Sequence, residues 1–152
     1  MLMYGIRPFL AEFYEYAMAN GFLSAKAENT PAVFDMFFRN VPDKGGFAIM
    51  AGTDTLIDSL CGLKFSDEEL DFLKEKGFGE RFLDYFRNFD FSCDVWAVPE
   101  GTPVFPNEPI IKVKGPVLQA QLIETVLLNI INFQTLVATK ANRVVRSAQG
   151  RI

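Results

Sequence analysis

The stretch from residue 117 to residue 148 constrains the fold most, because it contains neither proline nor glycine. Without these helix breakers the segment is predicted to form one mostly helical element, straight or bent. Most of its circumference is apolar and should face a core. The residues predicted to be buried there are Leu127, Ile130, Ile131 and Phe133.

A stripe of polar side chains runs along this predicted helix. At about 100° per residue, its members fall within one sector of roughly 120°. They are Gln121, Thr125, Asn129, Asn132, Thr135, Thr139 and Arg143. In one explanation, the amides and hydroxyls satisfy neighbouring backbone groups while the nearby cations complement the helix C-terminus. In the other, the stripe supports a ligand site or a subunit contact, and the cations address a phosphate.

The remaining sequence alternates helical and extended patterns. Helices are predicted over residues 8–21, 54–60, 66–77 and 80–89, the third opened by a capping box of Ser66 and Glu69. Segments 32–40 and 47–52 are β-rich and flank turn residues, so they are expected to pair as a hairpin. Segment 94–116 should form two or three short antiparallel strands. The fold class is therefore α+β, with short antiparallel strands and a long C-terminal helix.

Composition limits the function. A formal charge of −4 and a pI near 4.9 argue against general nucleic-acid binding, which needs a basic face. Cys61 and Cys93 lie far apart without a CxxC partner, so neither a metal cluster nor a disulfide scaffold is indicated. The apolar run at 126–138 is too short to span a bilayer. We therefore expect a soluble cytoplasmic protein without membrane partners.

Four segments of the chain carry a family resemblance. The N-terminal region of nicotinate phosphoribosyltransferases is similar to EFYEYAMANGF, FFRNVPDKGGFAIMAG, VPEGTPVFPNEPIIKVKGP and QLIETVLLNIINFQTLVATKANRVVRSAQGR. The resemblance implies the α/β-hammerhead-like N-terminal domain of a type II phosphoribosyltransferase, which an irregular α/β barrel follows. It also implies an enzyme that joins nicotinate to phosphoribosyl pyrophosphate with ATP hydrolysis, forming nicotinate mononucleotide for NAD salvage.

Five residues carry over as substrate-binding candidates because they match positions in the family's motifs. Tyr14 resembles the aromatic residue whose ring stacks on the pyridine of nicotinate, although a core-facing tyrosine is the alternative. Arg39 keeps its place in a Phe-x-Arg-Lys-Asn-Pro pattern that here lacks the lysine, and it either meets an anionic group or is solvated. Thr139, Lys140 and Arg143 keep the pattern Ala-Thr-Lys-x-x-Arg.

For the complete enzyme the resemblance implies ATP and Mg²⁺ as cofactors and a site assembled between subunits. Residues 1–152 are expected to be a single inactive domain that ends where the barrel would begin, with no metal site, no catalytic residue and no bound cofactor. The family's phosphorylatable histidine and glycine-rich phosphate loops belong to later sequence, and this chain contains no histidine. We expect a homodimer or higher oligomer, with residues 121–143 in the contact.

Two alternatives stay open. One is a relative of the quinolinate or nicotinamide phosphoribosyltransferases, which share the principles of this fold. The other is a non-catalytic interaction module similar to barrel-sandwich carriers such as lipoyl and biotinyl domains, because segment 94–116 has their strand-turn pattern. Its tight turn is Pro-Asn-Glu-Pro, however, and lacks the lysine that those carriers modify.

Overall fold

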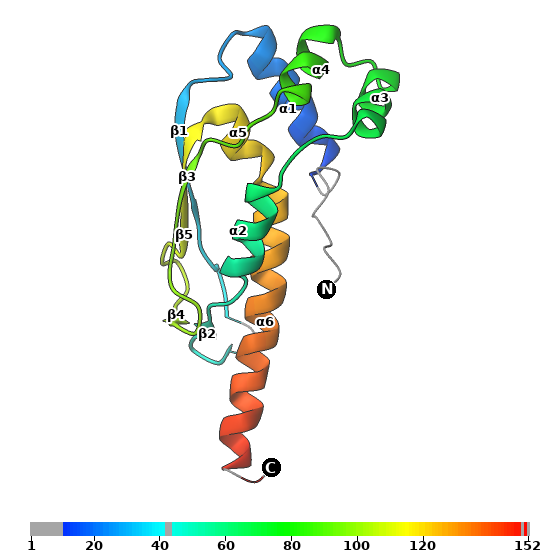
Figure 1. The fold of residues 1–152 in the computed structure, drawn as a ribbon. Coiled ribbons are helices and arrows are strands. Elements are labelled where there is room, and N and C mark those ends of the chain that lie inside the picture. Colours follow the sequence, from blue (N-terminus) through cyan, green and yellow to red (C-terminus); the bar gives the residue numbers. More distant parts are fainter. Residues whose placement is uncertain (1–10, 42–43, 150, 152) are drawn as a thin grey trace.

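The computed structural model describes residues 11–41, 44–149 and 151. Its elements in chain order are α1 (Phe13–Ser24), β1 (Pro31–Met36), β2 (Ala48–Ile49), α2 (Thr53–Cys61), α3 (Asp67–Glu75), α4 (Glu80–Arg87), β3 (Asp94–Ala97), β4 (Pro103–Val104), β5 (Ile111–Pro116), α5 (Val117–Leu122) and α6 (Glu124–Ala148). Figure 1 shows α6 as a long helix beside the strands. The helices α1, α3 and α4 cluster at the end of the molecule opposite to the C-terminal end of α6. The α+β class is confirmed.

The strands form two small antiparallel sheets. One has the order β1-β5-β3, and the other consists of β2 and β4. In the larger sheet, the register runs from Pro31 opposite Pro116 to Met36 opposite Ile111. β3 lies on the other edge of β5. The antiparallel strands predicted within 94–116 are therefore confirmed, although β4 joins β2 rather than its sequence neighbours.

The hairpin predicted between segments 32–40 and 47–52 is wrong. β1 ends at Met36 and pairs with β5, whereas β2 contains only two residues and pairs with β4. Turn residues between two β-rich segments do not decide which strands pair. Pairing with β5 aligns Met36 with Ile111, and both are buried, so the core selects a partner distant in sequence.

The long helical segment is confirmed, with a break at Ile123 between α5 and α6. Leu127 and Ile131 are buried as predicted, and Ile130 is half-buried. The prediction for Phe133 is wrong, because its side chain is 69% exposed. Thr135, two residues further on and about 200° round the helix, contacts the backbone of Ala51, so Phe133 lies on the opposite face of α6, which is not covered.

Aromatic rings fill the core beneath the N-terminal helices. The ring contacts join Tyr16 of α1 to Phe65 and Phe86, and Phe86 to Phe82 and Phe89. The first helix begins at Phe13 and continues to Ser24, so the predicted end at Gly21 is wrong. The predicted start at residues 8–10 lies outside the described residues.

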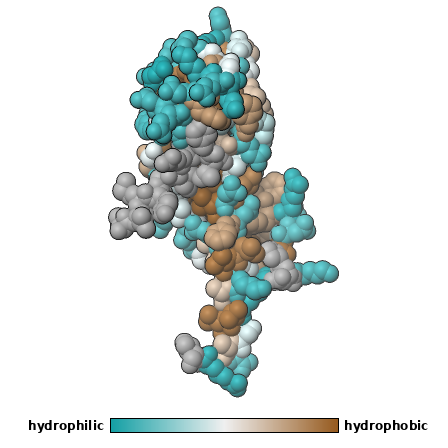
Figure 2. All heavy atoms as spheres, turned by 90° about the vertical axis from the view of Figure 1, so that its right-hand side faces the viewer, coloured by the Kyte–Doolittle hydropathy of each residue, from teal (hydrophilic) through white to brown (hydrophobic). Residues whose placement is uncertain are grey.

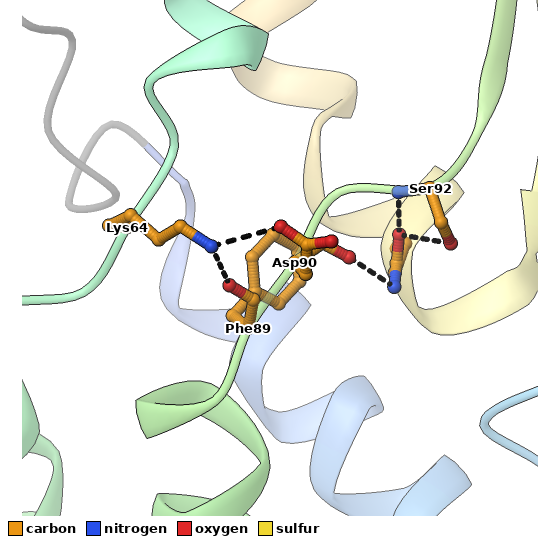
Figure 3. Close-up of polar contacts among 5 residues, drawn as sticks. Lys64, Phe89, Asp90 and Ser92 are labelled. Atoms are coloured by element: carbon orange, nitrogen blue, oxygen red, sulfur yellow. Dashed lines mark hydrogen bonds and ion pairs between the residues drawn. The ribbon is translucent and has the colours of Figure 1, made fainter.

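Three sets of polar contacts stabilise the loops that precede α3 and β3. The capping box is confirmed, since Ser66 N donates to Glu69 Oε2 at 2.7 Å and Glu69 N donates to Ser66 Oγ. Figure 3 shows the loop between α4 and β3, where Lys64 Nζ lies 2.7 Å from the Phe89 carbonyl oxygen and 3.0 Å from Asp90 Oδ1. The backbone N–H of Ser92, also drawn there, donates to Gln119 Oε1 of α5.

Candidate functional site

The polar stripe of α6 lies partly against β2. Three of its side chains, spaced four residues apart, hydrogen-bond to alternate backbone positions of the segment 47–51. The pairs are Thr135 with Ala51, Thr139 with Ile49, and Arg143 with Phe47. The Thr139 hydroxyl accepts from the Ile49 N–H at 2.8 Å, and Arg143 Nη2 donates to the Phe47 carbonyl oxygen at 3.2 Å.

The spacing of these contacts follows from helix and strand geometry. Four helical residues advance by about 6.0 Å and two strand residues by about 6.6 Å, so the two repeats stay nearly in step over three contacts. Thr135 and Thr139 are 2% and 1% exposed, and each hydroxyl is hydrogen-bonded to backbone. For these two residues the structure supports the explanation in which the stripe satisfies neighbouring backbone groups.

The first half of the stripe behaves differently. Gln121 is buried, whereas Asn129 and Asn132 are exposed. Thr125 donates its hydroxyl to Glu15 Oε1 of α1 at 3.0 Å. Burial raises the pKa of the Glu15 carboxyl above its ordinary value, and the hydrogen bonds from Glu12 and Thr125 oppose that rise. The stripe therefore meets different partners along its length.

Two cations lie near the C-terminal end of α6. Lys140 and Arg143 line an open recess together with Val144 and Ser147. Lys140 is exposed, and the Arg143 guanidinium lies close against Gly45, where an added Cβ would overlap it. Ammonium and guanidinium groups next to a hydroxyl form a donor set suited to phosphate oxygens.

The other candidate residues lie elsewhere. Tyr14, at the start of α1, is 47% exposed. Desolvation, and then the carboxylate of Glu124 at the start of α6, raise the pKa of its phenol. From Glu124 to Lys140 the helix advances by about 24 Å, so Tyr14 and the cations lie at opposite ends. Arg39 is exposed in the loop between β1 and β2. Of the five candidates, the structure groups only Thr139, Lys140 and Arg143.

Sequence reasoning missed Glu100, which caps α2 from a distant turn. Its Oε1 accepts hydrogen bonds from the backbone N–H groups of Gly52 and Thr53, both at 2.6 Å. A carboxylate is favourable there because the N-terminus of a helix carries partial positive charge. The Pro-Glu-Gly turn was visible in the sequence, but its position beside α2 depends on the pairing of β2 with β4.

Neither cysteine is part of a disulfide. Burial raises the pKa of the Cys93 thiol to about 11, so this thiol is protonated at neutral pH. Cys61 is exposed and also free. In the described part of the chain, no group of three or more His, Cys, Asp or Glu side chains could hold a metal ion. No helix among those residues is long and apolar enough to cross a membrane.

Comparison with protein families decides the relationship. The family model for the nicotinate phosphoribosyltransferase N-terminal domain matches residues 9–132. This chain belongs to the nicotinate phosphoribosyltransferase family. Its relatives include nicotinate phosphoribosyltransferase 2 of Arabidopsis thaliana, which is 42% identical over 141 residues. The Bacillus subtilis nicotinate phosphoribosyltransferase is 40% identical over 149 residues.

The matched region is the N-terminal part of these relatives. The alignments cover 91% and 95% of this chain but 25% and 30% of the Arabidopsis and Bacillus proteins. The crystal structure of human nicotinic acid phosphoribosyltransferase superposes with a TM-score of 0.86 at 35% identity, over 94% of this chain and 29% of the human chain. A nicotinate-nucleotide pyrophosphorylase from Pyrococcus furiosus gives a TM-score of 0.57 at 17% identity, which concerns the fold alone.

Proposed function

We propose that this phosphoribosyltransferase-family chain is the N-terminal domain of an enzyme that forms nicotinate mononucleotide from nicotinate and phosphoribosyl pyrophosphate, coupled to ATP hydrolysis. One observation carries the proposal. Proteins named as nicotinate phosphoribosyltransferases align with more than nine-tenths of this chain at about 40% identity. In the proposed architecture, the domain is α/β-hammerhead-like and works together with an α/β barrel.

We propose ATP and Mg²⁺ as cofactors of the complete enzyme. Mg²⁺ prefers oxygen ligands, mainly carboxylates and phosphates. Among the described residues, no group of three or more His, Cys, Asp or Glu side chains could hold a metal ion. We propose that the barrel binds both cofactors. The contribution of this domain is substrate binding, which the residues at the two ends of α6 supply.

The proposed roles follow from the chemistry of each side chain. Transfer of a phosphoribosyl group leaves pyrophosphate, so cations that neutralise this charge favour the reaction. Lys140 and Arg143 are suited to that task, and Arg39 to another anionic group. The Thr139 hydroxyl is already bonded to Ile49 and to the preceding helical turn, so we propose that it holds its neighbours in place.

A chimera tests the proposed function. Residues 1–152 would replace the matching N-terminal part of the Bacillus subtilis enzyme, whose barrel then supplies the rest of the site. We expect the chimera to form nicotinate mononucleotide from nicotinate, phosphoribosyl pyrophosphate and ATP, and we expect residues 1–152 alone to form none. A soluble, folded chimera without activity would contradict the proposal, and turnover by residues 1–152 alone would contradict the shared site.

Tyr14 offers a sharper test in the same chimera. If its ring stacks on the pyridine, Tyr14→Ala should raise the KM for nicotinate by about tenfold, corresponding to roughly 1.4 kcal/mol of lost contact. Tyr14→Phe keeps the ring face and should change KM by less than about twofold. Equal losses in both variants would point to the hydroxyl instead of the ring.

A further inference from the structure

Gly45 lies directly against the guanidinium of Arg143. An added Cβ at this position would overlap Nη2, Cζ and Nε of that side chain. Gly46 has a positive φ of 80°, but Gly45 lies outside the left-handed region, so space rather than backbone conformation requires glycine at residue 45. Because glycine has no side chain, the planar guanidinium of Arg143 can lie close against the backbone of Gly45.

The Arg143 guanidinium is also held by the strand that Gly45 precedes. It donates to the Phe47 carbonyl oxygen, and two residues further on the Ile49 N–H donates to Thr139, one turn earlier on α6. The backbone from residue 45 to residue 49 therefore runs along the same face of α6 that carries Arg143. Figure 1 shows this region, where β2 lies beside the middle of α6.

The positioned guanidinium borders the open recess that Lys140 and Ser147 also line. A guanidinium held before the ligand arrives loses less side-chain entropy on binding than a freely rotating one. It also keeps a defined distance from Lys140, three residues away on the same helix face. The two cations can then meet an anion with more than one oxygen at the same time.

We propose that Gly45 is a positioning residue, which keeps the Arg143 guanidinium in place so that Arg143 and Lys140 bind a phosphate or pyrophosphate group. The inference rests on the proposed function and identifies the phosphorylated part of the substrate as the group that this end of α6 binds. Thr139 contributes by holding the strand that continues from Gly45.

The test is titration of residues 1–152 with inorganic pyrophosphate at low ionic strength, followed by NMR of the Lys140 and Arg143 side chains. Wild type should show saturable shifts at both residues. Gly45→Ala should raise the apparent Kd for pyrophosphate by at least about fivefold, which corresponds to roughly 1 kcal/mol of binding free energy. The fold should survive, because the clash involves the far end of a flexible side chain. Gly21→Ala, with open space around its added Cβ, is the matched control and should bind as wild type does.

A double-mutant cycle separates positioning from a general structural effect. In an Arg143→Ala background, Gly45→Ala should cause no further loss of pyrophosphate affinity, because the guanidinium that it displaces is gone. A further loss there, an unchanged Kd for Gly45→Ala alone, or no binding by wild type would each overturn the inference. If any of these results is found and the chimera is active, the inference about Gly45 fails but the proposed function holds. If pyrophosphate binding depends on Gly45 and the chimera is inactive, the proposed function fails but the inference about Gly45 holds.

Discussion

Glu15 is a buried carboxyl whose ionisation opposes folding. Because burial raises its pKa, the folded state binds a proton at a higher pH than the unfolded state does. Its contribution to stability is therefore most favourable below the unfolded pKa, and it is lost as pH rises through the folded pKa. Between pH 7 and pH 5, the free energy of unfolding of wild type should increase relative to that of Glu15→Gln.

Urea denaturation of both proteins at the two pH values measures that difference. Glu75→Gln is the control, since it removes one carboxyl from an exposed position on α3. A difference between wild type and Glu15→Gln that stays constant from pH 7 to pH 5 would show that the Glu15 pKa is not raised.

Thr139 should stabilise the domain through its hydroxyl. Thr139→Val keeps the shape but leaves the partly buried Ile49 N–H without its acceptor, so it should lower the free energy of unfolding by about 1–2 kcal/mol. Thr139→Ser keeps the hydroxyl and loses only a methyl group, so it should cost less. Chemical denaturation of the two variants makes the comparison. A smaller loss for the valine variant would mean that packing outweighs the hydrogen bond.

At the scale of elements, the sequence predicted local structure better than pairing. The absence of helix breakers predicted the helical segment from 117 to 148, and the turn residues predicted strands within 94–116. Periodicity ranks the faces of a helix by polarity but cannot say which face is covered. Phe133 was therefore predicted to be buried and is exposed, whereas the polar Thr135 and Thr139 are buried. Their contacts with the segment 47–51 join residues distant in sequence, so helical periodicity does not predict them.

The start of α2 provides a test of backbone conformation. Gly52 has φ of 108°, and an added Cβ would come within 3.2 Å of Ile131 Cδ1 on α6. Gly52→Ala should therefore lower the free energy of unfolding by about 1–3 kcal/mol. Gly21→Ala, inside α1, should leave stability unchanged or raise it by up to about 1 kcal/mol. Thermal denaturation of both variants measures the two stabilities, and equal values would show that Gly52→Ala introduces no strain.

At the scale of the whole molecule, the sequence predicted the family but only part of the site's arrangement. Short motifs made Tyr14, Lys140 and Arg143 candidates, but a motif carries no distance between segments. The structure puts Tyr14 and the two cations at opposite ends of α6, so within one chain they cannot meet the same small substrate. Gly45 and Glu100 were missed because each acts on a residue distant in sequence. A second chain is one way to bring the two ends together.

We propose that copies of this chain associate through α6. Apolar side chains on the uncovered part of α6 are exposed: Phe133, Leu136, Val137, Val144 and Val145. Figure 2 shows apolar surface on the lower part of the molecule, where α6 extends past the sheets. Exposed apolar surface favours association, and identical chains commonly pair through a two-fold interface. We therefore expect residues 1–152 to form a homodimer or higher oligomer.

Light scattering at micromolar concentrations measures the oligomeric state. Asn132→Asp places a charge among these apolar side chains, next to Phe133, and should shift the protein toward monomer because pairing would bury that charge or bring two together. Asn29→Asp makes the same change at an exposed position between α1 and β1, far from the lower part of α6, and should leave the mass unchanged. If wild type is monomeric at high micromolar concentration and Asn132→Asp has no effect, this face of α6 does not join two copies, and the two ends of the helix belong to separate sites.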